Sequence, residues 1–212
     1  MDMPTTIQTE DVHSRAAAEA LLGAASAGRE EDVATLLKRG VPVDVSDSQG
    51  NTPLLLATAH DRLGVARLLV AAGADVNRQN RIHDSAYLLA GASGRLEILR
   101  LTLANGADLR STNRYGGTAL IPACERGHVE VVETLLKAGV DPDHVNRLGW
   151  TGLLEAILLS DGGPRHQAIV QRLINAGANL NLADNDGITP LQYAYQRNQT
   201  AIARMLEAAG AH

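Results

Sequence analysis

Four polar residues in the C-terminal third of the chain carry side chains that could bind a small ligand. Glu155 lies in an apolar stretch, Asp161 and His166 fall in a segment that contains Gly-Gly-Pro, and Tyr193 follows in a later apolar stretch. A carboxylate surrounded by apolar residues needs a polar partner, and the Tyr193 hydroxyl is a suitable donor. Two interpretations stay open: a buried structural acid, or a polar site for a small molecule or metabolite.

The other reactive residues are scattered along the chain. None of the seven histidines is followed at i, i+4 by a second ligand, and the single cysteine, Cys124, excludes an internal disulfide or a cysteine-based zinc site. The sequence contains no phosphate-binding GxxxxGK[ST] loop, no HExxH and no CxxC. We therefore expect a protein that is not an enzyme and that uses no cofactor and no metal.

Composition and charge narrow the class of partner. The net charge of -5 argues against general affinity for nucleic acid. No stretch approaches the 18 apolar residues of a membrane-spanning helix. The first residues lack the apolar core of a signal peptide, which predicts a cytoplasmic protein, or a periplasmic one if a signal peptide has been removed.

The elements that position these side chains repeat at a fixed interval. Similar segments follow one another in steps of 33 residues, and the last comes five residues late. The repeats start near Glu19, Thr52, Ser85, Thr118, Thr151 and Thr189. Five residues after each start stands an alanine: Ala24, Ala57, Ala90, Ala123, Ala156 and Ala194. A glycine recurs in the same way at Gly40, Gly73, Gly106, Gly139, Gly177 and Gly210.

The residue types within one repeat predict two helices and a turn. Threonine or serine at the start caps the first helix, and Pro53 and Pro190 stand at its first position, where a missing N–H does no harm. A second helix with apolar residues at helical spacing follows over 129–137, and the recurring glycine ends it in a left-handed conformation. Pro122 falls beyond the first turn of its helix, so we expect it to remove one hydrogen bond there.

Segments such as Gly50-Asn51-Thr52-Pro53-Leu54 and Gly73-Ala74-Asp75-Val76-Asn77 resemble the ankyrin-repeat family, and the resemblance covers residues 16–212. It implies an all-α solenoid of six helix-turn-helix repeats joined by β-hairpin-like loops, with inner helices and loop tips lining a concave face. The array is most similar to stand-alone bacterial ankyrin-repeat proteins. Residues 1–15 lie outside the pattern and are expected to form an N-terminal tail or an extension of the first helix.

The family resemblance implies that the protein binds other proteins and has no catalytic residues. Function is then expected where the shared pattern is free, at the loop tips and the ends of the inner helices. Arginine follows asparagine on three successive tips, and an apolar residue comes next. The predicted partner-binding residues of repeats three to five are Arg81, Ile82, Arg114, Tyr115, Arg126, Arg147, Leu148 and Trp150. Arginine and aromatic residues are enriched at binding hot spots.

These tips lead to our preferred function, a monomeric protein-interaction scaffold whose partner has an acidic surface. A structural interpretation of the tips also stays open, in which their aromatic rings fold back onto the neighbouring tip. The alternative function is binding of a small molecule or metabolite at a polar site around Glu155, Tyr193 and the 160–166 loop. An open groove would favour protein binding, and a closed cavity with convergent polar groups would favour a small molecule.

Overall fold

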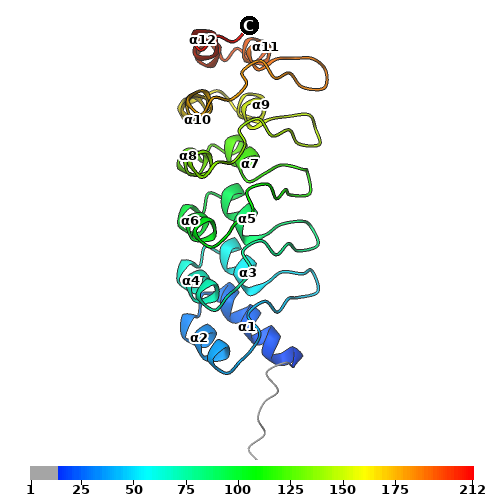
Figure 1. Ribbon diagram of the computed structural model, residues 1–212, viewed down its shortest axis with the longest axis vertical. Helices are drawn as coiled ribbons and strands as arrows, with labels where there is room; N and C mark the ends of the chain where they lie inside the picture. The colour runs from blue at the N-terminus through cyan, green and yellow to red at the C-terminus, as the bar shows by residue number, and fades with distance from the viewer. Residues whose placement is uncertain (1–13) are drawn as a thin grey trace, which may run out of the picture. The chain divides into compact units, whose positions relative to one another are not determined.

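The computed structural model describes residues 14–212, so residues 1–13 of the expected N-terminal tail lie outside the described part. These residues divide into two compact units, with the boundary in the sequence between Asp75 and Val76. All regular structure in residues 14–212 is helical, with twelve helices in six pairs (Figure 1). The predicted all-α fold of six helix-turn-helix repeats is confirmed. In each unit the odd-numbered, inner helices adjoin the long loops and the even-numbered, outer helices lie away from them.

The first unit holds repeats one and two. Its helices are α1 (Arg15–Ala27), α2 (Glu30–Lys38), α3 (Pro53–Ala59) and α4 (Leu63–Ala71). Helix α1 begins before Glu19, the expected start of the repeat. Ser14 caps it, because the Ser14 side chain accepts a hydrogen bond from the Ala17 N–H at 3.2 Å.

The second unit holds repeats three to six and all the candidate site residues. The inner helices are α5 (Ala86–Ala92), α7 (Leu120–Glu125), α9 (Gly152–Leu158) and α11 (Pro190–Gln196). The outer helices are α6 (Leu96–Ala104), α8 (Val129–Ala138), α10 (Pro164–Asn175) and α12 (Thr200–Ala208). Inner helices of successive repeats pack together, as α7, α9 and α11 do, and so do the outer helices α8, α10 and α12.

The recurring residues do what their types predict. Each of the six recurring alanines is at most 1% exposed, since a small side chain lets neighbouring helices approach closely. The six recurring glycines all have positive φ, from 79° at Gly177 to 95° at Gly210. An L-residue with a side chain rarely adopts this conformation, which explains the glycine where the outer helix ends.

Repeat four departs from the shared helix start. Thr52, Ser85, Thr151 and Thr189 each accept a hydrogen bond from the backbone three residues on. Thr118 does not: its hydroxyl is buried without a partner, and α7 begins only at Leu120. Pro122 explains the change because it has no N–H to donate to the Thr118 carbonyl, which accepts from Ile121 at 3.3 Å instead.

The long loops end in five-residue tips that share one hydrogen-bond pattern. The tips are 47–51, 80–84, 113–117, 146–150 and 184–188. In the 146–150 tip, the Asn146 side-chain oxygen accepts from the N–H groups of Leu148 and Trp150, at 2.9 and 3.1 Å. The equivalent Asp47, Asn80, Asn113 and Asp184 do the same in their own tips. The first residue of each tip is therefore structural.

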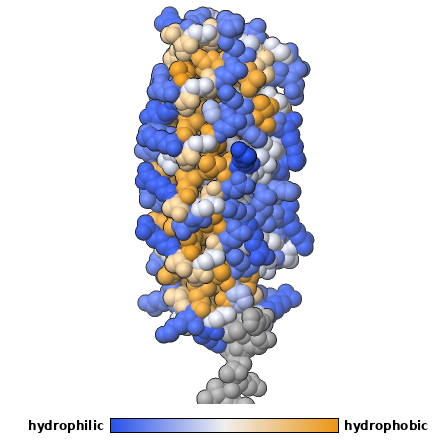
Figure 2. Space-filling view, viewed as in Figure 1, coloured by the Kyte–Doolittle hydropathy of each residue, from blue (hydrophilic) through white to orange (hydrophobic). Residues whose placement is uncertain are grey.

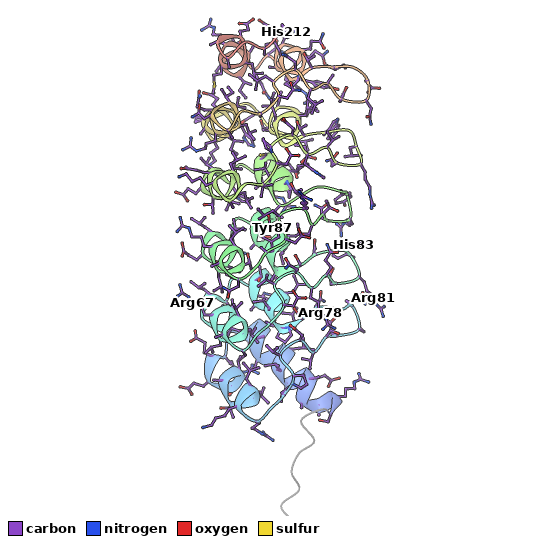
Figure 3. All side chains as sticks on the ribbon, in the orientation of Figure 1. Arg67, Arg78, Arg81, His83, Tyr87 and His212 are labelled. Atoms are coloured by element: carbon purple, nitrogen blue, oxygen red, sulfur yellow. The ribbon has the colours of Figure 1, made fainter. Side chains whose placement is uncertain are left out.

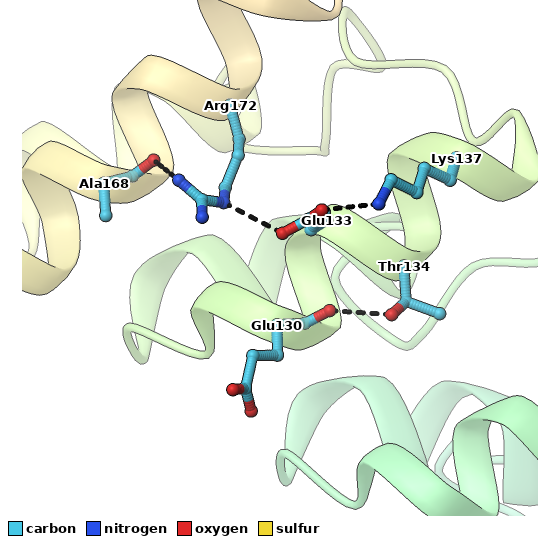
Figure 4. A network of polar contacts seen from close by, with 6 residues as sticks. All are labelled: Glu130, Glu133, Thr134, Lys137, Ala168 and Arg172. Carbon is cyan, nitrogen blue, oxygen red and sulfur yellow. Dashed lines mark hydrogen bonds and ion pairs between the residues drawn. The ribbon is translucent and has the colours of Figure 1, made fainter.

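The outer helices are joined by polar contacts at the surface. Arg172 of α10 donates to Glu133 of α8 at 3.3 Å, and Glu133 also pairs with Lys137 (Figure 4). In the view of Figure 2, apolar residues form a stripe over the helices of the second unit, with hydrophilic residues on both sides. Exposed ion pairs of this kind contribute little to stability, so the packed inner helices hold the repeats together.

Candidate binding groove

A groove of about 390 Å³ opens in the second unit between the inner helices and tips of repeats three to five. Its lining combines apolar, aromatic and charged side chains. The charged members are Asp84, Arg114, Glu125, Arg126 and Glu155. The apolar and aromatic members are Leu89, Ala92, Tyr115, Ile121, Pro122, Leu148, Trp150 and Leu159. Six of the residues singled out in the sequence thus lie together: Arg114, Tyr115, Arg126, Leu148, Trp150 and Glu155.

The tips bring three large apolar side chains to the surface. Ile82, Tyr115 and Leu148 hold the same place in successive tips, and they are 45%, 54% and 53% exposed. Tyr115 and Leu148 also line the groove, while Ile82 lies outside it. Large apolar side chains exposed side by side on repeated tips are a feature of binding surfaces.

The arginines on the tips serve partly as structural ties. The Arg147 side chain donates to the Arg114 carbonyl at 2.8 Å, and the Arg114 guanidinium lies 4.9 Å from the centre of the Tyr115 ring. Arg81 projects from the end of its tip (Figure 3). All three side chains are exposed, so their positive charge remains available to a partner. Arg147 and Arg81 do not line the groove itself.

Trp150 is half-buried at the edge of the groove. Hydrogen bonds to the Asp184 carboxylate, chiefly from Tyr193 and also from the side chain of Trp150, lower the pKa of Asp184. The Trp150 side chain therefore lies near the tip of repeat six, and it also contributes to the groove wall. Trp150 has both a structural contact and a surface available to a partner.

At one end of the groove, the negative charge of Asp84 is opposed by the positive charges of Arg114 and Arg126. Burial raises the pKa of Asp84, and the positive charges of Arg114 and Arg126 oppose this effect. Arg126 is itself fixed, because its guanidinium donates to the Ala92 carbonyl at 2.8 Å. The acid and the two arginines come from the tips of repeats three and four and from the end of α7.

The other end holds Glu155, which is only 6% exposed. The Asn146 side-chain amide donates to its carboxylate at 2.8 Å. Burial raises the pKa of Glu155 to about 7, and the negative charge of Glu125 adds to the effect. The expectation that Tyr193 donates to Glu155 is wrong: the Tyr193 hydroxyl donates to Asp184, one repeat on.

The remaining candidates for a small-molecule site lie apart from Glu155. Asp161 and His166 border a separate surface depression. The His166 ring bonds to the Glu125 carbonyl at 2.9 Å, which ties repeat five to repeat four. Of the four residues Glu155, Asp161, His166 and Tyr193, only Glu155 lines the groove.

Asn146, Glu125 and Asp84 also line the groove, although they are not among the site residues predicted from the sequence. The role of Asn146 could have been predicted from the sequence, because asparagine stands at the start of three successive tips where the first and last tips have aspartate. An amide can use its oxygen within the tip and still donate through its nitrogen.

In the described residues no group of three or more histidine, cysteine or acidic side chains is arranged to hold a metal ion. The helices found in residues 14–212 are too short or too polar to cross a bilayer.

Comparison with known proteins gives the same repeat assignment. The model for ankyrin repeats (3 copies) matches residues 7–80, 87–182 and 139–212. A putative ankyrin repeat protein of Escherichia coli K12, YahD, is 41% identical over 189 residues, which are 89% of this chain and 94% of YahD.

Solved structures agree over most of the chain. An ankyrin repeat domain from Acinetobacter baumannii AYE is 54% identical, with a TM-score of 0.88 over 91% of this chain and 98% of that one. The ankyrin repeat protein EF0377 is 43% identical, with a TM-score of 0.87 over 90% and 97%. The ankyrin repeat domain of Bcl-3, a member of the IkappaB family, is 31% identical, with a TM-score of 0.82 over 91% and 86%.

Proposed function

Because the chain belongs to the ankyrin-repeat family, we propose that it is a non-enzymatic scaffold that binds a partner protein through the groove and tips of repeats three to five. Ankyrin repeats are in general protein-interaction modules. The observation that carries the proposal is the row of exposed side chains Ile82, Tyr115 and Leu148 beside a groove with a half-buried Trp150. An aromatic anchor with surrounding apolar contacts is the usual composition of a binding hot spot.

The tip arginines define the class of partner. Arg81, Arg114 and Arg147 place three exposed positive charges along one edge of a protein whose net charge is -5. A complementary partner carries acidic residues opposite this edge. We propose that the scaffold acts as a monomer in the cytoplasm, where a protein with a single buried thiol, Cys124, is stable without disulfides.

A pair of tyrosines provides the test. Tyr115 and Tyr195 are 54% and 55% exposed, but only Tyr115 lies in the groove. Proteins captured from the source cell by the wild type are quantified by mass spectrometry against captures with Tyr115→Ala and Tyr195→Ala. A specific partner is depleted by Tyr115→Ala and retained by Tyr195→Ala. Equal capture by both variants contradicts the proposed surface.

Trp150 gives an independent readout with the purified partner. As the single tryptophan of the chain, it reports on its own surroundings without interference. Acrylamide quenches its fluorescence in the free protein, and the partner should protect it by covering the exposed part of the ring. Quenching that the partner leaves unchanged would place the interface elsewhere.

A further inference from the structure

We propose that the end of the groove beside Glu155 accepts one lysine or arginine side chain of the bound partner segment. This inference rests on the proposed function, because it assigns a chemical preference to the same groove. Three features carry it: a buried carboxylate that forms no ion pair in the described residues, a second acid that acts on it, and an aromatic wall, Trp150, that suits a cation.

Glu155 is held in place by a neutral group. The residue is only 6% exposed, and the group that donates to its carboxylate is the amide of Asn146, which brings no charge. Within residues 14–212, the ion pairs of the structure do not include Glu155. A buried carboxylate is stabilised most by a positive charge, and a cationic side chain entering the groove supplies one.

The charges along the groove favour a cation at this end. Glu125 acts on Glu155 as a second negative charge and raises its pKa, whereas Arg126 opposes this more weakly. The Arg126 guanidinium is turned to the Ala92 carbonyl, towards the end where Asp84 lies. At the Asp84 end two arginines already surround the acid, so an incoming cation would be repelled there.

The groove walls suit the rest of a basic side chain. Trp150 provides an aromatic surface, and Leu159 provides an apolar one for the methylene stem. The volume of about 390 Å³ accommodates one long side chain and the backbone that carries it. The tip arginines lie outside this end of the groove, where they can pair with acidic residues of the partner on either side of its basic residue.

The test is a selection of displayed random heptapeptides on the wild type and on Glu155→Gln. The glutamine has nearly the same shape and keeps an oxygen that accepts from Asn146, so the groove is preserved while the charge is lost. Wild-type selections should yield peptides enriched in lysine or arginine at one position, and Glu155→Gln selections should not. Glu130→Gln, an exposed acid on an outer helix, is the matched control and should keep the enrichment.

A selected peptide then measures the preference directly. Replacing its basic residue with norleucine should weaken binding to the wild type about tenfold, as for other desolvated charge pairs, and binding to Glu155→Gln about threefold or less. Glu125→Gln, which keeps Glu155 intact, should give an intermediate loss. Circular dichroism establishes that each variant is folded.

The outcomes separate the two proposals. Peptides that lose binding with Trp150→Ala but show no basic preference overturn the cation site and leave the groove as the interface. Peptides that bind equally well to Trp150→Ala, or a library that yields no binders, overturn both.

Discussion

The side-chain amide of Asn146 donates to the carboxylate of Glu155 across 2.8 Å. The equivalent positions of the next repeat carry Asp184 and Tyr193, with donor and acceptor exchanged, because there the hydroxyl donates to the carboxylate. In both repeats, one side-chain oxygen of the first tip residue accepts the hydrogen bonds that form the tip. The other polar atom of that side chain, the amide nitrogen of Asn146 or the second carboxylate oxygen of Asp184, bonds to a side chain of the inner helix. The two residue types must therefore be matched within each repeat.

Asn146→Asp should break this match. The tip can still form, as it does with Asp47 and Asp184, but the new carboxylate would face Glu155. We expect a loss of roughly 1–3 kcal/mol of unfolding free energy at pH 8, measured by urea denaturation, because a buried donor is lost. Asn113→Asp is the control and should be nearly neutral, since the equivalent inner-helix residue there is Pro122.

A second substitution tests the mechanism of that loss. Glu155→Gln in the Asn146→Asp background restores a donor opposite an acceptor, so much of the lost stability should return. A double variant no more stable than Asn146→Asp alone would mean that the 2.8 Å contact contributes nothing.

Glu155 should make stability depend on pH. Its pKa of about 7 in the folded protein lies above the ordinary 4.5, so its contribution is fully present below pH 4.5 and is lost as the pH rises through 7. The wild type should lose roughly 2–3 kcal/mol relative to Glu155→Gln between pH 5 and pH 8. Burial lowers the pKa of His128, which titrates with the opposite sign, so the wild-type and variant urea midpoints are compared at each pH. Parallel profiles would mean that Glu155 has an ordinary pKa.

The buried hydroxyls of Thr118 and Thr151 should differ in energy although both residues are almost fully buried. Thr151 caps α9 through the Leu154 N–H at 3.2 Å, whereas the Thr118 hydroxyl has no partner. Thr151→Val should therefore cost about 1 kcal/mol, and Thr118→Val should be neutral or stabilising. Thermal unfolding of the two variants gives the comparison, and equal losses would contradict the role given to Pro122.

Ala123 should tolerate no larger side chain. It is fully buried in α7, which packs on α5 and α9. Ala123→Leu should overpack this layer and cost roughly 1–3 kcal/mol. The same change at Ala138, exposed at the end of α8, should leave the melting temperature nearly unchanged. An unaffected Ala123→Leu variant would show that the inner helices pack loosely.

The tip arginines should control the rate at which a partner associates. Exposed charges steer encounters over a Debye length of about 8–10 Å, so the association rate should fall as salt is added. Arg81→Glu should reduce both the rate and its salt dependence, while Arg204→Glu on the outer helix α12 should not. Stopped-flow measurements with the purified partner, using Trp150 fluorescence, give both quantities. A rate independent of salt would exclude a steering role for the arginines.

The fold was predictable because the residues that determine it recur. Ala123 and its equivalents fix the inner helices, and the recurring glycines fix the ends of the outer helices, so a single sequence contains six copies of the same signal. Thr118 shows the limit of this reasoning. The pattern predicts a cap there, and Pro122 removes it by a backbone effect that is local to one repeat.

The groove was predictable only in part. The exposed positions of Tyr115 and Leu148 follow from their place in the tip. The partner of Glu155 does not, because it depends on which side of the Asn146 amide faces the helix. The same holds for Trp150. Its position on the tip can be predicted from the sequence, but its proximity to Asp184 depends on how closely the next repeat approaches.

The extra residues of repeat five have a consequence for how the second unit opens. Gln199 of repeat six donates to the carbonyls of Ile157 and Ser160, at 2.9 and 3.0 Å, and the His166 ring holds the Glu125 carbonyl of repeat four. Adjacent repeats usually exchange amide hydrogens with solvent in graded steps from the ends inward. In this unit, contacts from α9 and the 160–166 segment of repeat five link repeats four, five and six to one another. We therefore expect these three repeats to open as one cooperative block and to exchange their amide hydrogens together.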